Sequence, residues 1–290
     1  MASLKEIKER IGSVRSTRKI TAAMKMVAAA KLHRAQREIG ALIPYSEELQ
    51  SIVAHLAMGE GVGSIPLTEV RDVRGVTIVG FASNSTFCGA YNNNVGRRIV
   101  DQLNGEYAEL PQEHRRIFVM GKQLAVDLER SHIPFEKGDE HLAEKPNYLA
   151  YRTIAEQLME SFVAGRTDRV ELVYHKFLSA GTQRLVCETL LPIELPTSTE
   201  GGSVVAEDYI LEPTRKELIE SIVPREVALK LFTAALSATA SEHAARMMAM
   251  QAATDNADDL IASLSLEYNK QRQQAITTEL LDMMGGRGGE

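Results

Sequence analysis

The best candidate for chemistry in this sequence is a polar turn, residues 83–89 (Ser-Asn-Ser-Thr-Phe-Cys-Gly), between a predicted strand and a predicted helix. Free backbone N–H groups at such a place can bind phosphate, because a helix N-terminus favours negative charge. The sequence contains no G-x-x-x-x-G-K-[ST] loop, and no G-x-G-x-x-G follows a strand. A structural turn and a weak nucleotide site therefore both stay open, and the structural turn is favoured.

Other patterns typical of catalysis or metal binding are missing from the sequence. The seven histidines show no H-x-x-x-H spacing, and none has a neighbouring cysteine pair. There is no G-x-S-x-G elbow for a nucleophilic serine. The two cysteines, Cys88 and Cys187, have no metal-like spacing and predict buried, reduced thiols. We therefore predict no catalytic residue, no metal site and no cofactor.

The elements around the turn alternate between strands and helices. Short apolar runs bounded by polar or glycine-bearing segments predict the strands, and longer amphipathic stretches predict the helices. We expect strands at 75–81, 116–120, 170–178 and 183–191, the last two as a hairpin, and helices at 91–103, 122–130 and 148–163. This alternation predicts an α/β layer with a largely parallel sheet.

The two ends of the chain follow a helical pattern. Residues 225–284 contain neither Gly nor Pro, and one helix of that length would reach about 90 Å. Apolar or small residues recur at both ends with heptad spacing, which predicts a coiled-coil seam. We predict the N-terminal seam at Leu4, Ile7, Ile11, Val14, Ala28, Leu32, Ala35, Ile39, Leu42, Leu49, Val53 and Leu56, and the C-terminal seam at Val227, Leu231, Ala234, Ala238, Ala245, Met248, Ala252, Ala262, Leu266, Ile276, Leu280 and Met283.

Together these patterns predict the α/β fold class, with a long antiparallel coiled coil formed by the N- and C-terminal helices and a central Rossmann-like α/β domain. The expected boundaries are 1–58 for the N-terminal helix, 70–208 for the central domain and 212–284 for the C-terminal helix.

The charge distribution predicts an anionic neighbour for the N-terminal helix. Residues 1–38 carry +7 and the remainder −13, from a net charge of −6. Acidic protein, nucleic acid and lipid all fit a basic helix. This helix has no aromatic residue to stack on bases, which favours protein. A coiled-coil nucleic-acid-binding or scaffold protein, and a nucleotide-dependent enzyme, are the alternatives. No apolar run approaches the ~20 residues that a membrane span needs.

Three segments of the sequence resemble the gamma subunit family of F-type ATP synthases. Residues 11–31 (IGSVRSTRKITAAMKMVAAAK) are similar to that family's I-x-S-V-x-x-T-x-K-I-T-x-A-M-x-M-V-A-A-x-K. Residues 87–92 (FCGAYN) are similar to its L-C-G-x-x-N. Residues 242–256 (EHAARMMAMQAATDN), followed by 268–272 (YNKQR) and 276–279 (ITTE), form the third segment, and the linker 208–213 (DYILEP) is also similar.

The resemblance implies a rotor shaft without an active site. In that family the paired helices stand inside a ring of three alpha and three beta subunits. The α/β domain lies below, with the epsilon subunit, on the membrane ring of c subunits. Proton flow turns the shaft, which drives the catalytic beta subunits through ATP synthesis, and ATP hydrolysis drives the reverse. It implies no nucleic-acid partner and no insertion into the membrane.

The resemblance also assigns contact residues. Those matching family positions that contact the beta subunit are Arg18, Lys19, Met24, Lys25, Arg272, Gln273, Thr277 and Glu279; those at the bearing tip are Leu280, Leu281, Met283 and Met284; and those in the rotor-foot region are Tyr209 and Glu212.

The sequence departs from the family pattern at two places. Asn84-Ser85-Thr86 stands where the family commonly has D-[RK]-G, which argues against a charge-based role for this turn. The end, residues 285–290, is more polar than usual in the family. The regulatory cysteine pair of plant-chloroplast forms is also missing, so we expect a bacterial protein, peripheral on the cytoplasmic face of the inner membrane.

Overall fold

The computed structural model describes residues 3–57, 65–193, 211–212 and 214–285. The chain divides into two compact units: a terminal unit of Met1–Ala29 and Arg246–Glu290, and a central unit of residues 30–245. Two long helices, α1 (Leu4–Ala57) and α6 (Arg215–Gly285), each contribute residues to both units. None of the described helices has a stretch long and apolar enough to span a bilayer.

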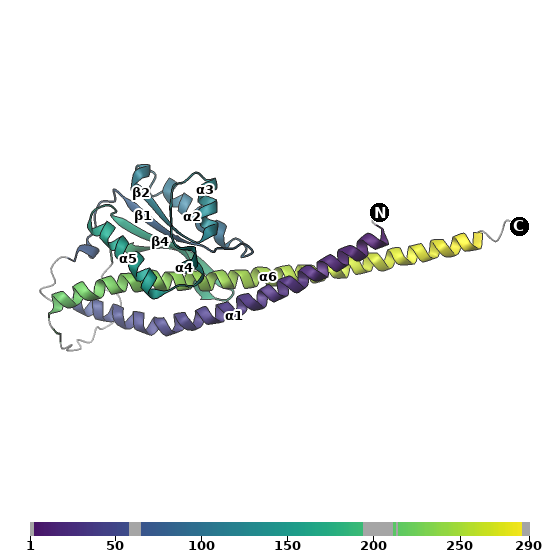
Figure 1. Cartoon of the computed structure of the whole chain (residues 1–290), viewed down its shortest axis with the longest axis horizontal. Helices are drawn as coiled ribbons and strands as arrows, with labels where there is room; N and C mark the ends of the chain where they lie inside the picture. Colours follow the sequence, from purple (N-terminus) through teal and green to yellow (C-terminus); the bar gives the residue numbers. More distant parts are fainter. Residues whose placement is uncertain (1–2, 58–64, 194–210, 213, 286–290) are drawn as a thin grey trace. The chain divides into compact units, whose positions relative to one another are not determined.

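The central unit is built on a five-stranded sheet in the order β3-β2-β1-β4-β5 (Figure 1). The central strand β1 (Val76–Phe81) pairs in parallel with β2 (Arg115–Met120) and with β4 (Arg169–Ser179). Strand β3 (Glu136–Lys137) extends the parallel part, and β5 (Thr182–Leu191) forms an antiparallel hairpin with β4. The prediction of a largely parallel sheet ending in a hairpin is confirmed.

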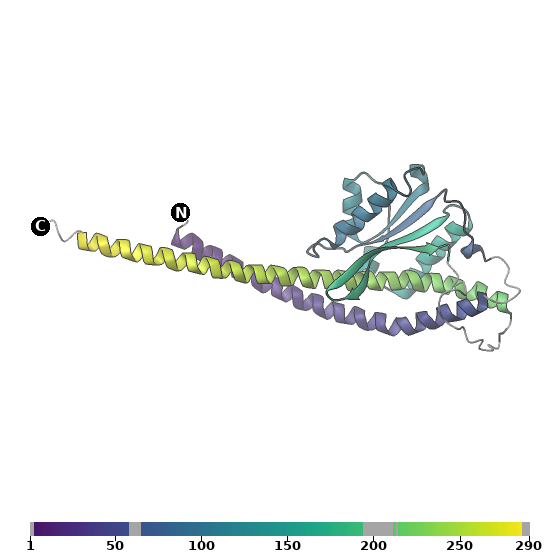
Figure 2. The same ribbon diagram turned by 180° about the vertical axis from the view of Figure 1, so that it is seen from behind.

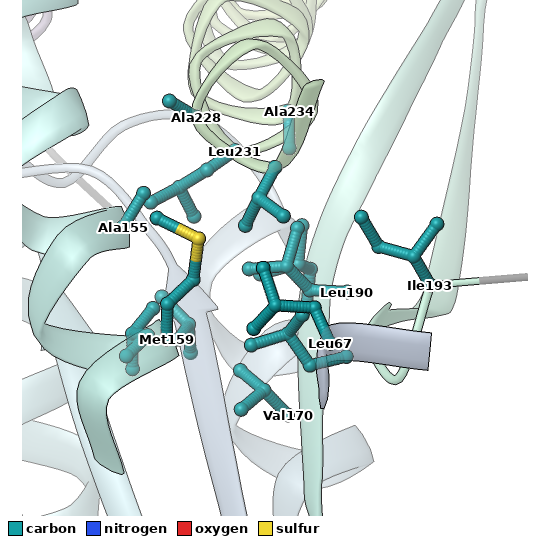
Figure 3. Close-up of a cluster of buried hydrophobic side chains, with 14 of the residues drawn as sticks. Leu67, Ala155, Met159, Val170, Leu190, Ile193, Ala228, Leu231 and Ala234 are labelled. Carbon is teal, nitrogen blue, oxygen red and sulfur yellow. The ribbon is translucent and has the colours of Figure 1, made fainter. Parts of the chain in front are cut away.

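Helices cover both faces of this sheet, because the central strand has apolar side chains on both faces and all of its residues are buried. On one face, α2 (Tyr91–Asn104) and α3 (Lys122–Arg130) pack over Ile78 and Ile117. On the other, α5 (Tyr148–Val163), α6 and the end of α1 enclose a core that includes Leu231 and Met159 (Figure 3). The structure adds the short helix α4 (Glu140–Glu144) and two 3₁₀ turns, Pro66–Thr68 and Gln112–His114, which the sequence did not predict.

Close packing at the carboxyl end of β1 depends on two glycines. A Cβ on Gly80 would lie 2.6 Å from a methyl of Leu124 and 2.7 Å from one of Ile99, so glycine lets α2 and α3 approach the sheet. Gly121 has φ +113, and its Cβ would lie 2.1 Å from the carbonyl oxygen of Ala82. The start of α3 and the turn after β1 therefore fit together only with glycine here.

In the terminal unit, the first part of α1 and the last part of α6 run antiparallel, side by side (Figures 1 and 2). Ile7 and Ile11 pack on Leu264, with Val14 and Tyr268 at the edge of this cluster. The last turns of α6 extend beyond the beginning of α1 in both views. The predicted fold class, an antiparallel coiled coil of the terminal helices with a central α/β domain, is therefore confirmed.

The predicted seam holds along α1 but fails in the distal part of α6. The residues of the predicted α1 seam are all buried or partly buried. In distal α6, by contrast, Met248 and Leu266 are exposed. The buried positions there are Met250, Ala257 and Leu264, seven residues apart, with partly buried polar side chains between them. The prediction was wrong because it followed apolar residues, whereas the true seam includes threonine and tyrosine. The predicted positions that are exposed are Met248, Ala252, Ala262, Leu266, Ile276, Leu280 and Met283.

Candidate functional site

Hydrogen bonds from side chains of this chain hold the turn after β1, residues 83–89, in place. Asn92 accepts the N–H of Ser83 at 3.0 Å, and its amide donates to the Ser83 hydroxyl at 3.2 Å and to the Ser85 carbonyl at 3.3 Å. Asn84 accepts the N–H of Lys122 at 3.0 Å. Since side chains of the chain itself hold the turn closed, its geometry fits the structural interpretation. Within the described part of the chain, no three His, Cys, Asp or Glu side chains gather as a metal site.

Buried polar contacts attach α6 to the α/β sheet within the central unit. The Tyr91 hydroxyl donates to the carbonyl oxygen of Ala238 at 2.9 Å, and the Tyr91 ring stacks on His175 with centroids 4.5 Å apart. The Ser241 hydroxyl donates to the His175 carbonyl at 2.8 Å. The side chains of Tyr91, His175 and Ser241 are buried. Strand β4, helix α2 and helix α6 are therefore joined at one point.

Two further contacts continue this attachment along α6. The N–H of Phe177 donates to the Ser237 hydroxyl at 2.8 Å, and the Lys230 ammonium donates to the carbonyl oxygen of Thr189 at 2.7 Å. We call Tyr91, His175, Ser237 and Ser241 the attachment cluster. Buried hydrogen bonds fix rotation as well as distance, because they weaken when their geometry is lost.

Burial sets the protonation state of the histidine in the attachment cluster. Desolvation lowers the pKa of His175 to about 4, because the low-dielectric surroundings disfavour the charged ring. The imidazole is therefore neutral at pH 7, which suits its stacking on Tyr91 within the core.

In the terminal unit, the two helices are joined by polar contacts where the apolar stripe of α1 is interrupted. The hydroxyls of Thr21 and Thr254 lie 2.8 Å apart. The Arg18 guanidinium lies 2.5 Å from the Asp258 carboxylate, with about half of each side chain exposed. A pair this exposed stabilises weakly. The predicted contact residue Arg18 is therefore held on the helix pair and is still accessible.

The other predicted contact residues lie on α1 and distal α6. Lys19 is exposed, whereas Met24 and Lys25 are half-buried. The predicted residues of α6 (Arg272, Gln273, Thr277 and Glu279) are all exposed, and the Thr277 hydroxyl donates to the Gln273 carbonyl at 2.8 Å within the helix. These four side chains thus form a polar group near the end of α6, with the exposed Ile276 among them.

The last turns of α6 are apolar and exposed. Leu280, Leu281 and Met283 are 56%, 63% and 73% exposed. Met284 belongs to the same helix, but its side chain lies outside the described residues, as does Tyr209 of the predicted foot. Glu212, the other foot residue, is exposed. Large apolar side chains at a helix end in water indicate a surface that a partner covers.

Sequence reasoning missed two groups of residues. One is the attachment cluster. The signal that could have found it is the row of hydroxyl side chains, Ser237, Thr239 and Ser241, inside an Ala-rich helix. The other group is a set of exposed apolar residues on α1, off the seam: Ile20, Met26 and Val27 are 60%, 66% and 58% exposed. These three lie within the family-like segment 11–31.

Sequence comparison gives full-length matches to one protein family. The model of the ATP synthase family matches residues 3–288. The chain is 46% identical to the ATP synthase gamma chain of Bacteroides thetaiotaomicron over 296 aligned residues, covering 99% of each. It is 48% identical to that of Bacteroides fragilis, again over 99% of each. None of these matches supports the alternatives of a nucleic-acid-binding protein or scaffold.

Structural comparison finds the same fold in solved rotary assemblies. A chain of the Euglena gracilis mitochondrial ATP synthase rotor matches with a TM-score of 0.61 at 19% identity, covering 94% of this chain and 98% of that one. A chain in the Euglena OSCP/F1/c-ring structure matches with a TM-score of 0.63 at 20% identity, covering 98% and 93%. At this identity the likeness concerns the fold.

Proposed function

The chain belongs to the family of ATP synthase gamma chains, and we propose that it is the central rotor shaft of a bacterial F-type ATP synthase. The shaft couples proton translocation through the membrane sector to the conformational cycle of the catalytic beta subunits. Its partners are the alpha and beta subunits that surround it, the epsilon subunit and the membrane ring of c subunits. We propose that the chain has no active site and lies peripherally on the cytoplasmic face of the inner membrane.

The observation that supports this function best is the solvent-exposed end of α6. Helix α6 runs unbroken over Arg215–Gly285, and Leu280, Leu281 and Met283 are exposed at its end. An apolar end that is left in water favours aggregation unless a partner encloses it. A collar of subunits would enclose it, and flexible apolar side chains form few directional bonds that rotation must break. We therefore assign Leu280, Leu281 and Met283 to the bearing tip, and we add Met284 from the match to the family segment.

A shaft must also be fixed to the domain that transmits torque to it. The attachment cluster fixes α6 to the α/β domain in this way. Apolar packing alone permits small sliding between helix and sheet. The hydroxyls of Tyr91 and Ser241 bond to backbone carbonyls, which fixes the rotation of α6 against the sheet within the central unit. Torque applied to the α/β domain then passes into α6 at residues 237–241.

Besides the bearing tip, we assign the predicted side chains to two surfaces. Each surface follows from the match to family segments; its described members are exposed, apart from Met24 and Lys25, which are half-buried. Beta-subunit contacts are Arg18, Lys19, Met24, Lys25, Arg272, Gln273, Thr277 and Glu279; the rotor foot contains Tyr209 and Glu212; and the working segments are the shaft helices 1–58 and 212–284 with the α/β domain at 70–208.

Reconstitution with alpha and beta subunits tests this function. The chain should assemble with them into an ATP-hydrolysing complex, and a bead fixed to the α/β domain should rotate in one direction during hydrolysis. A chain that stays separate from alpha and beta subunits, or a complex whose bead does not turn, would contradict the proposal.

A charge reversal tests the grip near the end of α6. Arg272→Glu should leave the chain folded, because the side chain is exposed, but should weaken the coupling of rotation to ATP turnover. Lys270→Glu is the matched control, since Lys270 is an exposed cation on the same helix outside the assigned contacts. Equal ATP synthesis by the Arg272 variant and the wild type would remove Arg272 from the contact surface.

A further inference from the structure

The short helix α4 contacts both the turn after β1 and the helix α1 (Figure 1). On the side of the turn, the Asn84 amide donates to the carbonyl oxygen of Glu140 at 2.6 Å, and its own oxygen accepts the N–H of Lys122 at 3.0 Å. An ionised carboxylate at this position could accept the N–H but would have no hydrogen to donate to Glu140. Asn84 therefore makes a contact with α4 that the aspartate common in the family could not make.

The segment around α4 is also held to the rest of the central unit. The N–H of Gly138 donates to the carbonyl oxygen of Val119 in β2 at 2.9 Å. Leu142 packs on the core that α5, α6 and the end of α1 enclose, and its carbonyl oxygen accepts the Tyr151 hydroxyl of α5 at 3.3 Å. Helix α4 is therefore fixed to the sheet and to α5.

An ion pair joins α4 to α1. The Lys31 ammonium lies 3.1 Å from the Glu144 carboxylate, and the two side chains are 48% and 52% exposed. The hydrogen bond from Lys31 lowers the pKa of Glu144, which keeps the carboxylate charged at neutral pH. A pair this exposed stabilises weakly, so it can open while both helices stay folded.

The packing of α1 on α6 is incomplete at the same level. A cavity of about 160 Å³ lies between α1, α6 and the segment that follows α4, and Ala35 and Leu236 are among its lining residues. Side chains that line a void lose the van der Waals contacts that a packed neighbour would give them. Val53 and Leu56 of α1 are buried in the core, but this attachment lies about 33 Å along the helix from Lys31. The contact with α4 therefore supports α1 where its packing on α6 is incomplete.

We propose that α4 is a brace that fixes α1 to the α/β domain: Asn84 holds the start of α4 to the turn, and Lys31 holds its end, at Glu144, to α1. The inference rests on the proposed function, because it concerns how torque enters the shaft. The attachment cluster fixes α6 to the sheet, and the brace gives α1 a fixed point of its own. The α/β domain then turns both helices directly, so that α1 is not driven through α6 alone.

Charge reversal and its rescue test the brace in the reconstituted complex. Lys31→Glu sets two carboxylates against each other and should lower ATP synthesis about threefold, within the range of an exposed pair, while ATP hydrolysis changes less. Adding Glu144→Lys to this variant should restore synthesis, because the pair forms again with its charges exchanged.

Arg34→Glu is the matched control for this rescue. Arg34 lies close to Lys31 on α1, lines the same cavity and pairs with Glu38 within the helix at 3.1 Å. Synthesis should stay at the wild-type level in Arg34→Glu. It should fall when Glu144→Lys is added, because this second change still breaks the pair with Lys31.

Asn84→Asp tests the other end of the brace. The new carboxylate can still accept the Lys122 N–H, so the turn keeps its shape, but it repels the carbonyl oxygen of Glu140. Synthesis should fall as in Lys31→Glu, and Glu144→Lys should not restore it.

Amide hydrogen exchange of the unassembled full chain separates the brace from the proposed function. Residues 30–38 of α1 should exchange about threefold faster in Lys31→Glu than in the chain with both charges exchanged. Equal exchange in these two chains, or ATP synthesis that Lys31→Glu leaves unchanged in an assembled complex, would overturn the brace. A wild-type chain that never assembles with alpha and beta subunits would refute the proposed function, whereas the exchange result would still decide whether the brace exists.

Discussion

Removing two hydroxyls from the attachment cluster tests whether the shaft is fixed to the sheet by hydrogen bonds. Tyr91→Phe keeps the ring that stacks on His175 and deletes only the bond of 2.9 Å to Ala238. Ser241→Ala deletes the bond of 2.8 Å to His175. Each bond contributes about 0.5–1.5 kcal/mol net, and up to ~3 kcal/mol where a buried carbonyl loses its partner. We expect about 2 kcal/mol for the double variant.

Amide hydrogen exchange and thermal unfolding measure this loss. A change of ~2 kcal/mol corresponds to about 30-fold faster exchange in α6 residues 237–245, provided that they exchange through local opening. It also corresponds to a fall in Tm of roughly 4–8 °C for a domain of this size. At a temperature where both proteins are folded, ATP synthesis by the reconstituted complex should fall more than ATP hydrolysis. Synthesis requires the sheet to drive α6 against a load.

Tyr148→Phe is the matched control for this experiment. The Tyr148 ring also packs on α6, edge-on to Phe232 with centroids 5.7 Å apart, and the hydroxyl has no hydrogen bond recorded in the described structure. The Tyr148→Phe variant should change neither the amide hydrogen exchange of α6 nor ATP synthesis. If the double variant behaved like this control, packing alone would hold α6, and the hydrogen-bonded joint would be refuted.

Three other predictions concern stability. Gly121→Ala should prevent stable folding or cost several kcal/mol, measured by urea unfolding, because its Cβ would overlap the carbonyl oxygen of Ala82. The free energy of unfolding should rise with pH between about 4 and 6.5, because in this range His175 binds a proton in the unfolded state but stays neutral in the folded state. In His175→Asn, the free energy of unfolding from urea curves should depend less on pH over this range. Arg18→Ala should cost under about 1 kcal/mol in low salt and less in high salt, because the pair with Asp258 is half exposed.

The layers of the fold could be predicted from the sequence because the longer strands and helices of the central domain each follow a local pattern. The predicted helices 122–130 and 148–163 match α3 and α5 in the structure. Short elements were missed, since β3 and α4 have too few residues for a periodic signal. The attachment cluster could not be predicted, because it joins residues 91, 175 and 241, which only the tertiary fold brings together.

The error in the distal seam of α6 shows where periodicity reaches its limit. An apolar stripe indicates that another element buries this face of the helix. It does not tell whether that element belongs to the same chain or to another subunit. In distal α6, Met250, Ala257 and Leu264 are buried, whereas Leu266 and Leu280 are 74% and 56% exposed. Distal α6 therefore has two apolar faces, and only one is covered within the chain. The second face has no internal partner among the described residues, which is what a shaft enclosed by other subunits requires.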